Sequence, residues 1–161
     1  MTVLALDLGV RTGWARSDGT SGVFSVHGLD DHGRALAAFS DWIDAELDAQ
    51  PLIYLAIERG FGGNNAVGRL TTAMELTAHA AAWARVIPRT DRAAVQVRKW
   101  LLGYGTISKA LEPSKAARVR RMDAEVLAAV QARGWWPDSE HAADACALLA
   151  CCEKMPVRMA A

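Results

Sequence analysis

The stretch "TVLALDL" (residues 2–8) is an apolar run rich in β-forming residues that carries the carboxylate of Asp7 near its end. Short apolar runs bounded by turn residues are typical of buried strands. A second run of this kind, "LIYLAIE" (52–58), also ends in a carboxylate, that of Glu58. If the two strands are neighbours, both carboxylates project together from one sheet. The two runs therefore predict the centre of the fold and a candidate site at once.

The segments around these two runs alternate between strand and helix patterns. Apolar residues at three- and four-residue steps predict helices, and Gly, Pro and Ser mark their ends. The sequence predicts a mixed α/β sheet with helices on both faces. The other expected strands lie over 13–17, 22–28 and near 85–90, and helices are expected over 33–49, 66–85 and 94–102. Gly103 should end the last of these helices, and an exposed loop should follow it to Pro113. Ser114 should cap a helix over 115–133, and Ser139 or Asp138 should cap the final helix.

The length and composition set the broad class. With 161 residues, 52% of them hydrophobic, the chain can bury one core, and we expect a single domain over residues 1–161. No apolar run approaches the roughly 20 residues of a membrane span, and the N-terminus lacks signal-peptide features, so a cytoplasmic protein without a membrane partner is expected. Cys146, Cys151 and Cys152 lack metal-ligand spacing and are interpreted as core thiols.

The charge is balanced overall but divided along the chain. Residues 1–84 hold five Lys/Arg and ten Asp/Glu, whereas residues 85–161 hold thirteen and eight, so the halves carry −5 and +5. Ten of the basic residues lie within 85–121, where Asp91 and Glu112 are the acids. A local basic surface of this kind allows a neutral protein to bind a polyanion.

The final helix carries polar residues where it should turn inward. In "SEHAADACALL" (139–149), His141 and Asp144 are three residues apart and share one helix face. Buried carboxylates are costly unless a cation neutralises them, and oxygen-rich sites suit Mg²⁺ or Mn²⁺. We therefore expect the first turn of this helix to meet Asp7 and Glu58 at a metal site able to support phosphodiester hydrolysis.

Four blocks, in this order, resemble one protein family. "LALDLGVRTGWA", "AIERGF", "VRKWLLGYGTISK" and "HAADACALL" are similar to the signature segments of RuvC-type Holliday-junction resolvases of bacterial or phage type. The resemblance covers roughly residues 2 to 150. It implies a ribonuclease H-like fold, a homodimer and a metal-dependent endonuclease that cuts branched DNA with two Mg²⁺ ions, which Mn²⁺ can replace.

The resemblance also implies roles for particular residues. Asp7, Glu58 and Asp144 match the acidic metal ligands of the family, and His141 stands where many members carry an aspartate, as a ligand or a proton carrier. Phe61 matches the aromatic residue at the junction centre, where it would stack on a base. The residues expected to contact phosphates are Arg59, Arg98, Lys99, Lys109, Lys115 and Arg118.

Other interpretations stay open for several of these features. His141 could be a helix-end residue, Asp138 or Glu140 could replace it as a ligand, and Phe61 could lie in the core. The apolar stripe of the helix over 66–85 could form a dimer interface or pack within the monomer; it comprises Val67, Leu70, Met74, Ala78, Ala81 and Ala82.

Two other functions also fit parts of the sequence. A junction-binding protein without catalysis would share the basic surface, and an actin-like phosphate-binding domain would share the strand and Asp-x-Gly turn. The latter requires a second copy of the domain, which the chain lacks, so no nucleotide cofactor is expected.

Overall fold

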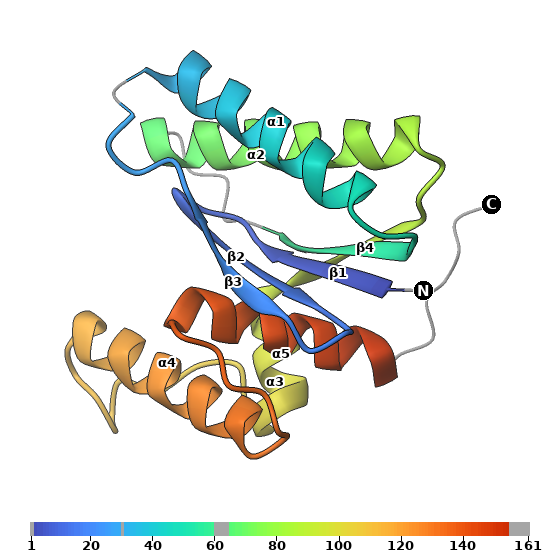
Figure 1. The fold of residues 1–161 in the computed structure, drawn as a ribbon. Coiled ribbons are helices and arrows are strands. Elements are labelled where there is room, and N and C mark those ends of the chain that lie inside the picture. The colour runs from blue at the N-terminus through green and yellow to red at the C-terminus, as the bar shows by residue number, and fades with distance from the viewer. Residues whose placement is uncertain (1, 30, 60–64, 155–161) are drawn as a thin grey trace.

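A mixed sheet lies at the centre of the computed structural model, which describes residues 2–29, 31–59 and 65–154 (Figure 1). Its order is β3-β2-β1-β4-β5. The first three strands pair antiparallel, and β4 pairs parallel with both β1 and β5. The mixed α/β sheet predicted from the sequence is confirmed. The strands are β1 (Thr2–Asp7), β2 (Arg11–Arg16), β3 (Ser21–Ser25), β4 (Leu52–Arg59) and β5 (Arg89–Ala93).

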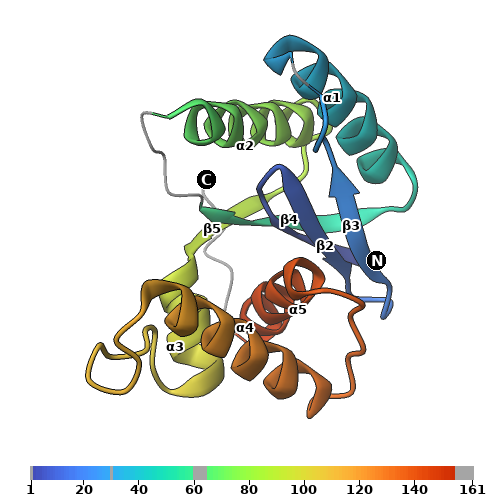
Figure 2. The same ribbon diagram turned by 90° about the vertical axis from the view of Figure 1, so that its left-hand side faces the viewer.

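Helices cover both faces of this sheet (Figures 1 and 2). On one face lie α1 (His32–Asp48) and α2 (Ala66–Ala84), and on the other lie α3 (Ala94–Leu102), α4 (Lys115–Gln131) and α5 (Glu140–Lys154). Side chains alternate between the two faces along each strand. The sheet therefore separates two hydrophobic cores.

The central strand β1 shows this alternation most clearly. Leu4 and Leu6 pack in the core beneath α1 and α2, whereas Val3 and Ala5 pack in the core beneath α5. A strand buried on both faces must be apolar throughout, which is why it appears in the sequence as a continuous hydrophobic run. The residue that follows in the α5-facing series is Asp7.

Helix α5 lies against β1 and β2 and is buried on most of its surface (Figure 2). Alanines fill much of it, which allows the helix backbone to approach the sheet closely. Cys146, Cys151 and Cys152 are free and buried in this helix, so the interpretation as core thiols is confirmed.

Most element boundaries agree with those expected from the sequence. The Ser114 and Ser139 hydroxyls accept hydrogen bonds from the backbone N–H groups of Ala117 and Ala142 and cap α4 and α5. Gly103 ends α3 in a left-handed conformation with φ of 85°. These caps satisfy backbone groups that a helix end leaves unpaired.

The position of the fifth strand was predicted wrongly. The sequence placed it over 85–90, but residues 85–88 form the turn that closes α2, with the Ile87 N–H donating to the Ala82 carbonyl. β5 begins only at Arg89 and includes Asp91 and Arg92. Three of the five residues of this edge strand are charged, so it is missed when strands are sought as apolar runs.

The stripe of α2 that was considered for a dimer interface packs largely within the chain. Most of the stripe is buried between α2 and the sheet, namely Leu70, Met74, Ala78 and Ala82. Of the stripe, only Val67 is exposed. Besides Val67, α2 leaves Leu76 and Trp83 exposed, which are 65% and 75% accessible.

Among the helices that the structure describes, none combines the length and apolar character needed to cross a bilayer.

Candidate active site

Asp7 and Glu58 lie side by side because β1 and β4 are parallel neighbours. Their Cα positions are register partners, and both residues belong to the series of side chains that faces α5. Glu58 is buried, while Asp7 remains partly accessible. The predicted pairing of the two strand-end carboxylates is confirmed.

Helix α5 brings Asp144 over these carboxylates. Asp144 lies one turn into the helix and is half-buried, and its charge acts on both Asp7 and Glu58. His141, one turn earlier, is 33% exposed, and its Nε2 atom lies 3.9 Å from Glu140 Oε1. The last helix therefore contributes to the same site as the two strands.

Gly13 allows this close approach of α5, and its role was missed at the level of the sequence. It pairs with Asp7 in the sheet, and a Cβ atom at this position would lie 1.9 Å from the His141 carbonyl oxygen. Real carbon and oxygen atoms cannot approach so closely, so only glycine fits. The absence of this side chain lets the first turn of α5 rest on β2 beside Asp7.

The three acids have strongly perturbed protonation equilibria. Burial raises the pKa of Asp7 to about 7, and repulsion from Asp144 adds to the rise. Burial and then the charges of Asp7 and Asp144 hold the pKa of Glu58 well above its ordinary value. The pKa of Asp144 rises to about 6, chiefly because of burial. Three crowded carboxyls of this kind need a nearby positive charge to be fully ionised.

Arg98 of α3 provides part of this charge. Its Nη2 atom lies 3.8 Å from Asp144 Oδ2, and its guanidinium lowers the pKa values of all three acids. From the sequence, Arg98 was expected to contact phosphate. In the structure it lies against the acidic site.

The donor set fits a hard divalent cation. Asp7, Glu58 and Asp144 offer carboxylate oxygens, the ligands that Mg²⁺ and Mn²⁺ prefer, and their raised pKa values show how unfavourable their negative charges are without one. In the part of the chain that the structure describes, these three do not form a group whose ligand atoms all lie within 4.8 Å. A bound cation would reduce the repulsion among these carboxylates.

Asp123 of α4 is a further acid near the site that sequence reasoning missed. Burial raises its pKa, while Arg98 and His141 lower it. It lines two open cavities, one of about 420 Å³ together with Asp138 and Glu140, and one of about 250 Å³. The signal available in the sequence was a pair of carboxylates, Asp123 and Glu125, between the apolar positions Met122 and Val126 of a helix that begins with basic residues.

The predicted basic residues divide into two groups. Arg98, Lys115 and Arg118 line the 250 Å³ cavity, although the Arg118 guanidinium also donates to the carbonyls of Glu112 and Pro113. The other three residues are exposed outside this cavity. Arg59 lies at the end of β4, Lys99 lies on α3, and Lys109 lies in the loop after α3. Phe61 lies outside the described residues.

Comparisons with known proteins identify the fold. No family model and no curated protein sequence matches the chain. Its structure matches the Thermus thermophilus RuvC structure at 19% identity, with a TM-score of 0.66 over 92% of this chain and 90% of that chain. The chain has the fold of a RuvC resolvase.

Two further structures share the RuvC fold. T. thermophilus RuvC in complex with Holliday junction substrate matches at 16% identity with a TM-score of 0.64, over 92% of this chain and 90% of that one. The yeast mitochondrial Holliday junction resolvase Ydc2 matches at 14% identity with a TM-score of 0.52, over 91% of this chain and 75% of that one. The expected ribonuclease H-like architecture is thereby confirmed.

Proposed function

We propose that this protein is a metal-dependent endonuclease that resolves four-way junctions or other branched DNA by paired phosphodiester hydrolysis. The observation that carries the proposal is the convergence of Asp7, Glu58 and Asp144 on one face of a RuvC-fold sheet. The proposal agrees with the neighbouring structures, one of which is in complex with Holliday junction substrate.

The proposed ligands of the cation are the three acids, with His141 at their edge. Two Mg²⁺ ions, or Mn²⁺ in their place, would supply the activation of a water molecule and the stabilisation of the leaving oxygen. The chain itself fixes the geometry, because parallel pairing aligns Asp7 with Glu58 and Gly13 sets the height of α5 above them. His141 offers an imidazole that can ligate a metal or carry a proton near neutral pH.

The basic residues near the site are proposed to hold the DNA backbone. Arg98, Lys115 and Arg118 line one cavity with Asp123, next to the acids. Exposed Arg59, Lys99 and Lys109 extend the positive charge beyond it. Phosphate contacts of this kind orient a duplex arm without reading its sequence. Phe61, two residues after the end of β4 in the sequence, is proposed to stack on an unpaired base at the branch point.

Paired cuts on symmetric strands require two active sites, which supports a homodimer. Leu76 and Trp83 of α2 are the exposed apolar residues that a second copy could cover. Sizing at micromolar concentration tests this assignment. Trp83→Asp should shift a dimer to a monomer, whereas a wild-type protein that is monomeric with and without DNA would contradict it.

The decisive experiment compares DNA substrates and metals. The protein is incubated with a labelled four-way junction, a matched duplex and a single strand, each with Mg²⁺, Mn²⁺ or a chelator. We expect symmetric cuts in the junction with either metal and none with the chelator. Junction binding without cuts under every condition would instead identify a binding protein.

Variants at His141 separate its two proposed roles from a structural one. His141→Ala should reduce cleavage more than junction binding, and His141→Asp should retain activity if the position serves as a ligand. A normal cleavage rate for the alanine variant would reduce His141 to a helix-end residue.

A further inference from the structure

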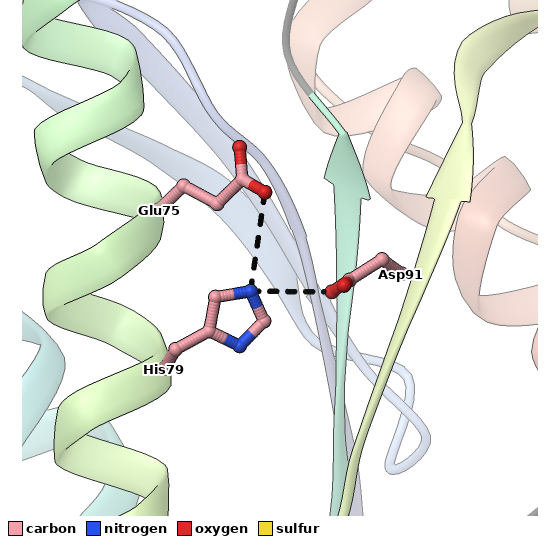
Figure 3. Close-up of side chains that lie close together, drawn as sticks. All are labelled: Glu75, His79 and Asp91. Atoms are coloured by element: carbon pink, nitrogen blue, oxygen red, sulfur yellow. Dashed lines mark ion pairs between the residues drawn. The ribbon is translucent and has the colours of Figure 1, made fainter.

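A second group of potential metal ligands lies on the other face of the sheet. Glu75 and His79 are one turn apart on α2, and Asp91 faces them from β5 (Figure 3). His79 Nε2 lies 3.4 Å from Asp91 Oδ1 and 3.9 Å from Glu75 Oε1. The three ligand atoms lie within 4.8 Å of one another.

These side chains face one another, but the separations between their nitrogen and oxygen atoms are longer than a normal hydrogen bond. A hydrogen bond between an imidazolium and a carboxylate is normally about 2.7–2.9 Å long, shorter than either separation here. Asp91 Oδ1 and His79 Nδ1 are buried atoms with no hydrogen-bond partner within the described ranges. A buried carboxylate oxygen without a partner is rare and is commonly explained by a missing water or ion.

The 3.4 Å separation between His79 Nε2 and Asp91 Oδ1 matches the ligand spacing of a tetrahedral metal, and Glu75 Oε1 lies somewhat farther out, 3.9 Å from the same nitrogen. Zinc bonds to imidazole nitrogen and carboxylate oxygen are about 2.0–2.2 Å long, which places tetrahedral ligands about 3.4 Å apart. Octahedral Mg²⁺ at about 2.1 Å would place adjacent ligands about 3.0 Å apart and takes oxygen ligands instead of imidazole. The donor set and the spacing therefore favour zinc.

We propose that Glu75, His79 and Asp91 form a Zn²⁺ site that joins α2 to the edge strand β5. Three protein ligands leave a fourth position for water. The side chains of His79 and Asp91 are 19% and 28% exposed, so an ion can enter from solvent.

This site is separate from the acidic site in space. Asp91 pairs in the sheet with Ile57, whose side chain lies in the core beneath α1 and α2. The next residue, Glu58, faces α5 on the opposite side. Binding at the zinc site can therefore be measured independently of cleavage and of the proposed function.

Zinc titration of metal-stripped protein tests the proposal. Calorimetry against a competing chelator should show one high-affinity site in wild-type protein, and Zn²⁺ should raise the melting temperature. Co²⁺ bound at the same site should give the intense visible absorption of tetrahedral coordination.

Variants assign the ligands. His79→Gln and Asp91→Asn should each weaken zinc binding about tenfold or more and remove the Co²⁺ absorption. The control His27→Gln changes an exposed histidine outside the cluster and should bind like wild type. His141→Ala tests whether the acidic site contributes, and it should also retain the zinc site.

Two results would overturn the proposal. One is the absence of zinc binding and of any zinc-dependent rise in melting temperature in wild-type protein, which would leave Glu75, His79 and Asp91 as a polar cluster without a metal. The other is binding that persists in His79→Gln but disappears in His141→Ala. If His79→Gln does not fold, Glu75→Gln provides the same comparison.

Discussion

The two polar clusters of this protein occupy opposite faces of one sheet and differ in their donors. The α5 face holds three carboxylates, all with raised pKa values, beside Arg98. The α2 face holds two carboxylates and an imidazole that are largely buried. Oxygen donors alone favour a hard cation, whereas the added nitrogen favours zinc. The same sheet thus carries two proposed metal sites, and the helix above each face contributes ligands to its site.

The largest expected effect is the loss of cleavage in a variant of the acidic cluster that keeps zinc binding. Asp7→Asn should reduce junction cleavage below about a thousandth of wild type, because the contribution of a catalytic metal is several kcal/mol. Junction binding and zinc binding should both survive. Gel-based cleavage, gel shift and calorimetry measure the three properties.

The reciprocal variant completes this test. Asp91→Asn should lose zinc binding and still cleave, and Asp41→Asn on α1 should change neither. A loss of cleavage in Asp91→Asn comparable to that in Asp7→Asn would show that the two clusters act as one.

Gly13→Ala should reduce cleavage by moving α5, which carries Asp144 of the acidic cluster. The added Cβ would meet the His141 carbonyl, so α5 must move away from the sheet and carry Asp144 with it. Misplacement of about 1 Å at a reacting centre can cost about 100-fold in rate, and overpacking typically costs about 1–3 kcal/mol of stability. Cleavage kinetics and thermal melting measure the effect.

The control for this variant is Gly33→Ala in the first turn of α1, a helix on the opposite face of the sheet from α5 (Figure 1). Its added Cβ would meet only the side chain of Asp31. Zinc binding should be unchanged in both variants. Full cleavage by Gly13→Ala would mean that the height of α5 is not critical.

The metal-free stability should depend on pH through the α5-facing cluster. A carboxyl whose pKa is higher in the folded state contributes stability below its unfolded pKa and loses it as pH rises through the folded value. For Asp7 this window runs from an ordinary pKa of 3.8 to a folded pKa of about 7. Wild-type protein should therefore be most stable, relative to a variant without this carboxyl, at the acidic end of the window.

The measurement is thermal melting in chelator between pH 4 and pH 8. Wild-type protein should lose stability across this range relative to Asp7→Asn, and Mg²⁺ should restore part of it at pH 8. Parallel curves for the two proteins would contradict the buried, repelled state of Asp7.

The smallest expected effect concerns the exposed charges. Lys99→Glu with Lys109→Glu should weaken junction binding and reduce its salt dependence, since each phosphate contact contributes about −0.9 to the slope of log K against log salt. Zinc binding should not change. The matched control is Lys154→Glu, at the end of α5. An unchanged junction affinity would place the DNA elsewhere.

Much of the α5-facing site could be predicted from the sequence because it lies at the ends of regular elements. Asp7 and Glu58 end two apolar runs, and a fully buried strand is recognisable from composition alone. Asp144 interrupts an otherwise apolar helix face. Caps at Ser114, Ser139 and Gly103 were equally visible, since they depend on local backbone chemistry.

The remaining features depend on contacts between distant segments. Glu75 and His79 have helical spacing, but the third member of their cluster lies on a strand that was predicted to end before Asp91. The role of Gly13 depends on the path of a helix more than 100 residues later, and that of Asp123 on how α4 packs beside α5. Patterns within one segment do not contain this information.

The buried cysteines of α5 offer a direct way to follow the opening of the candidate active site. Because burial raises the pKa values of Cys146, Cys151 and Cys152, they resist alkylation while the helix stays packed. Their labelling rate in native buffer therefore reports how often the helix that carries Asp144 detaches from the sheet. Mass spectrometry of each modified peptide would show whether the helix detaches as one unit or frays from its C-terminal end, where Cys151 and Cys152 lie.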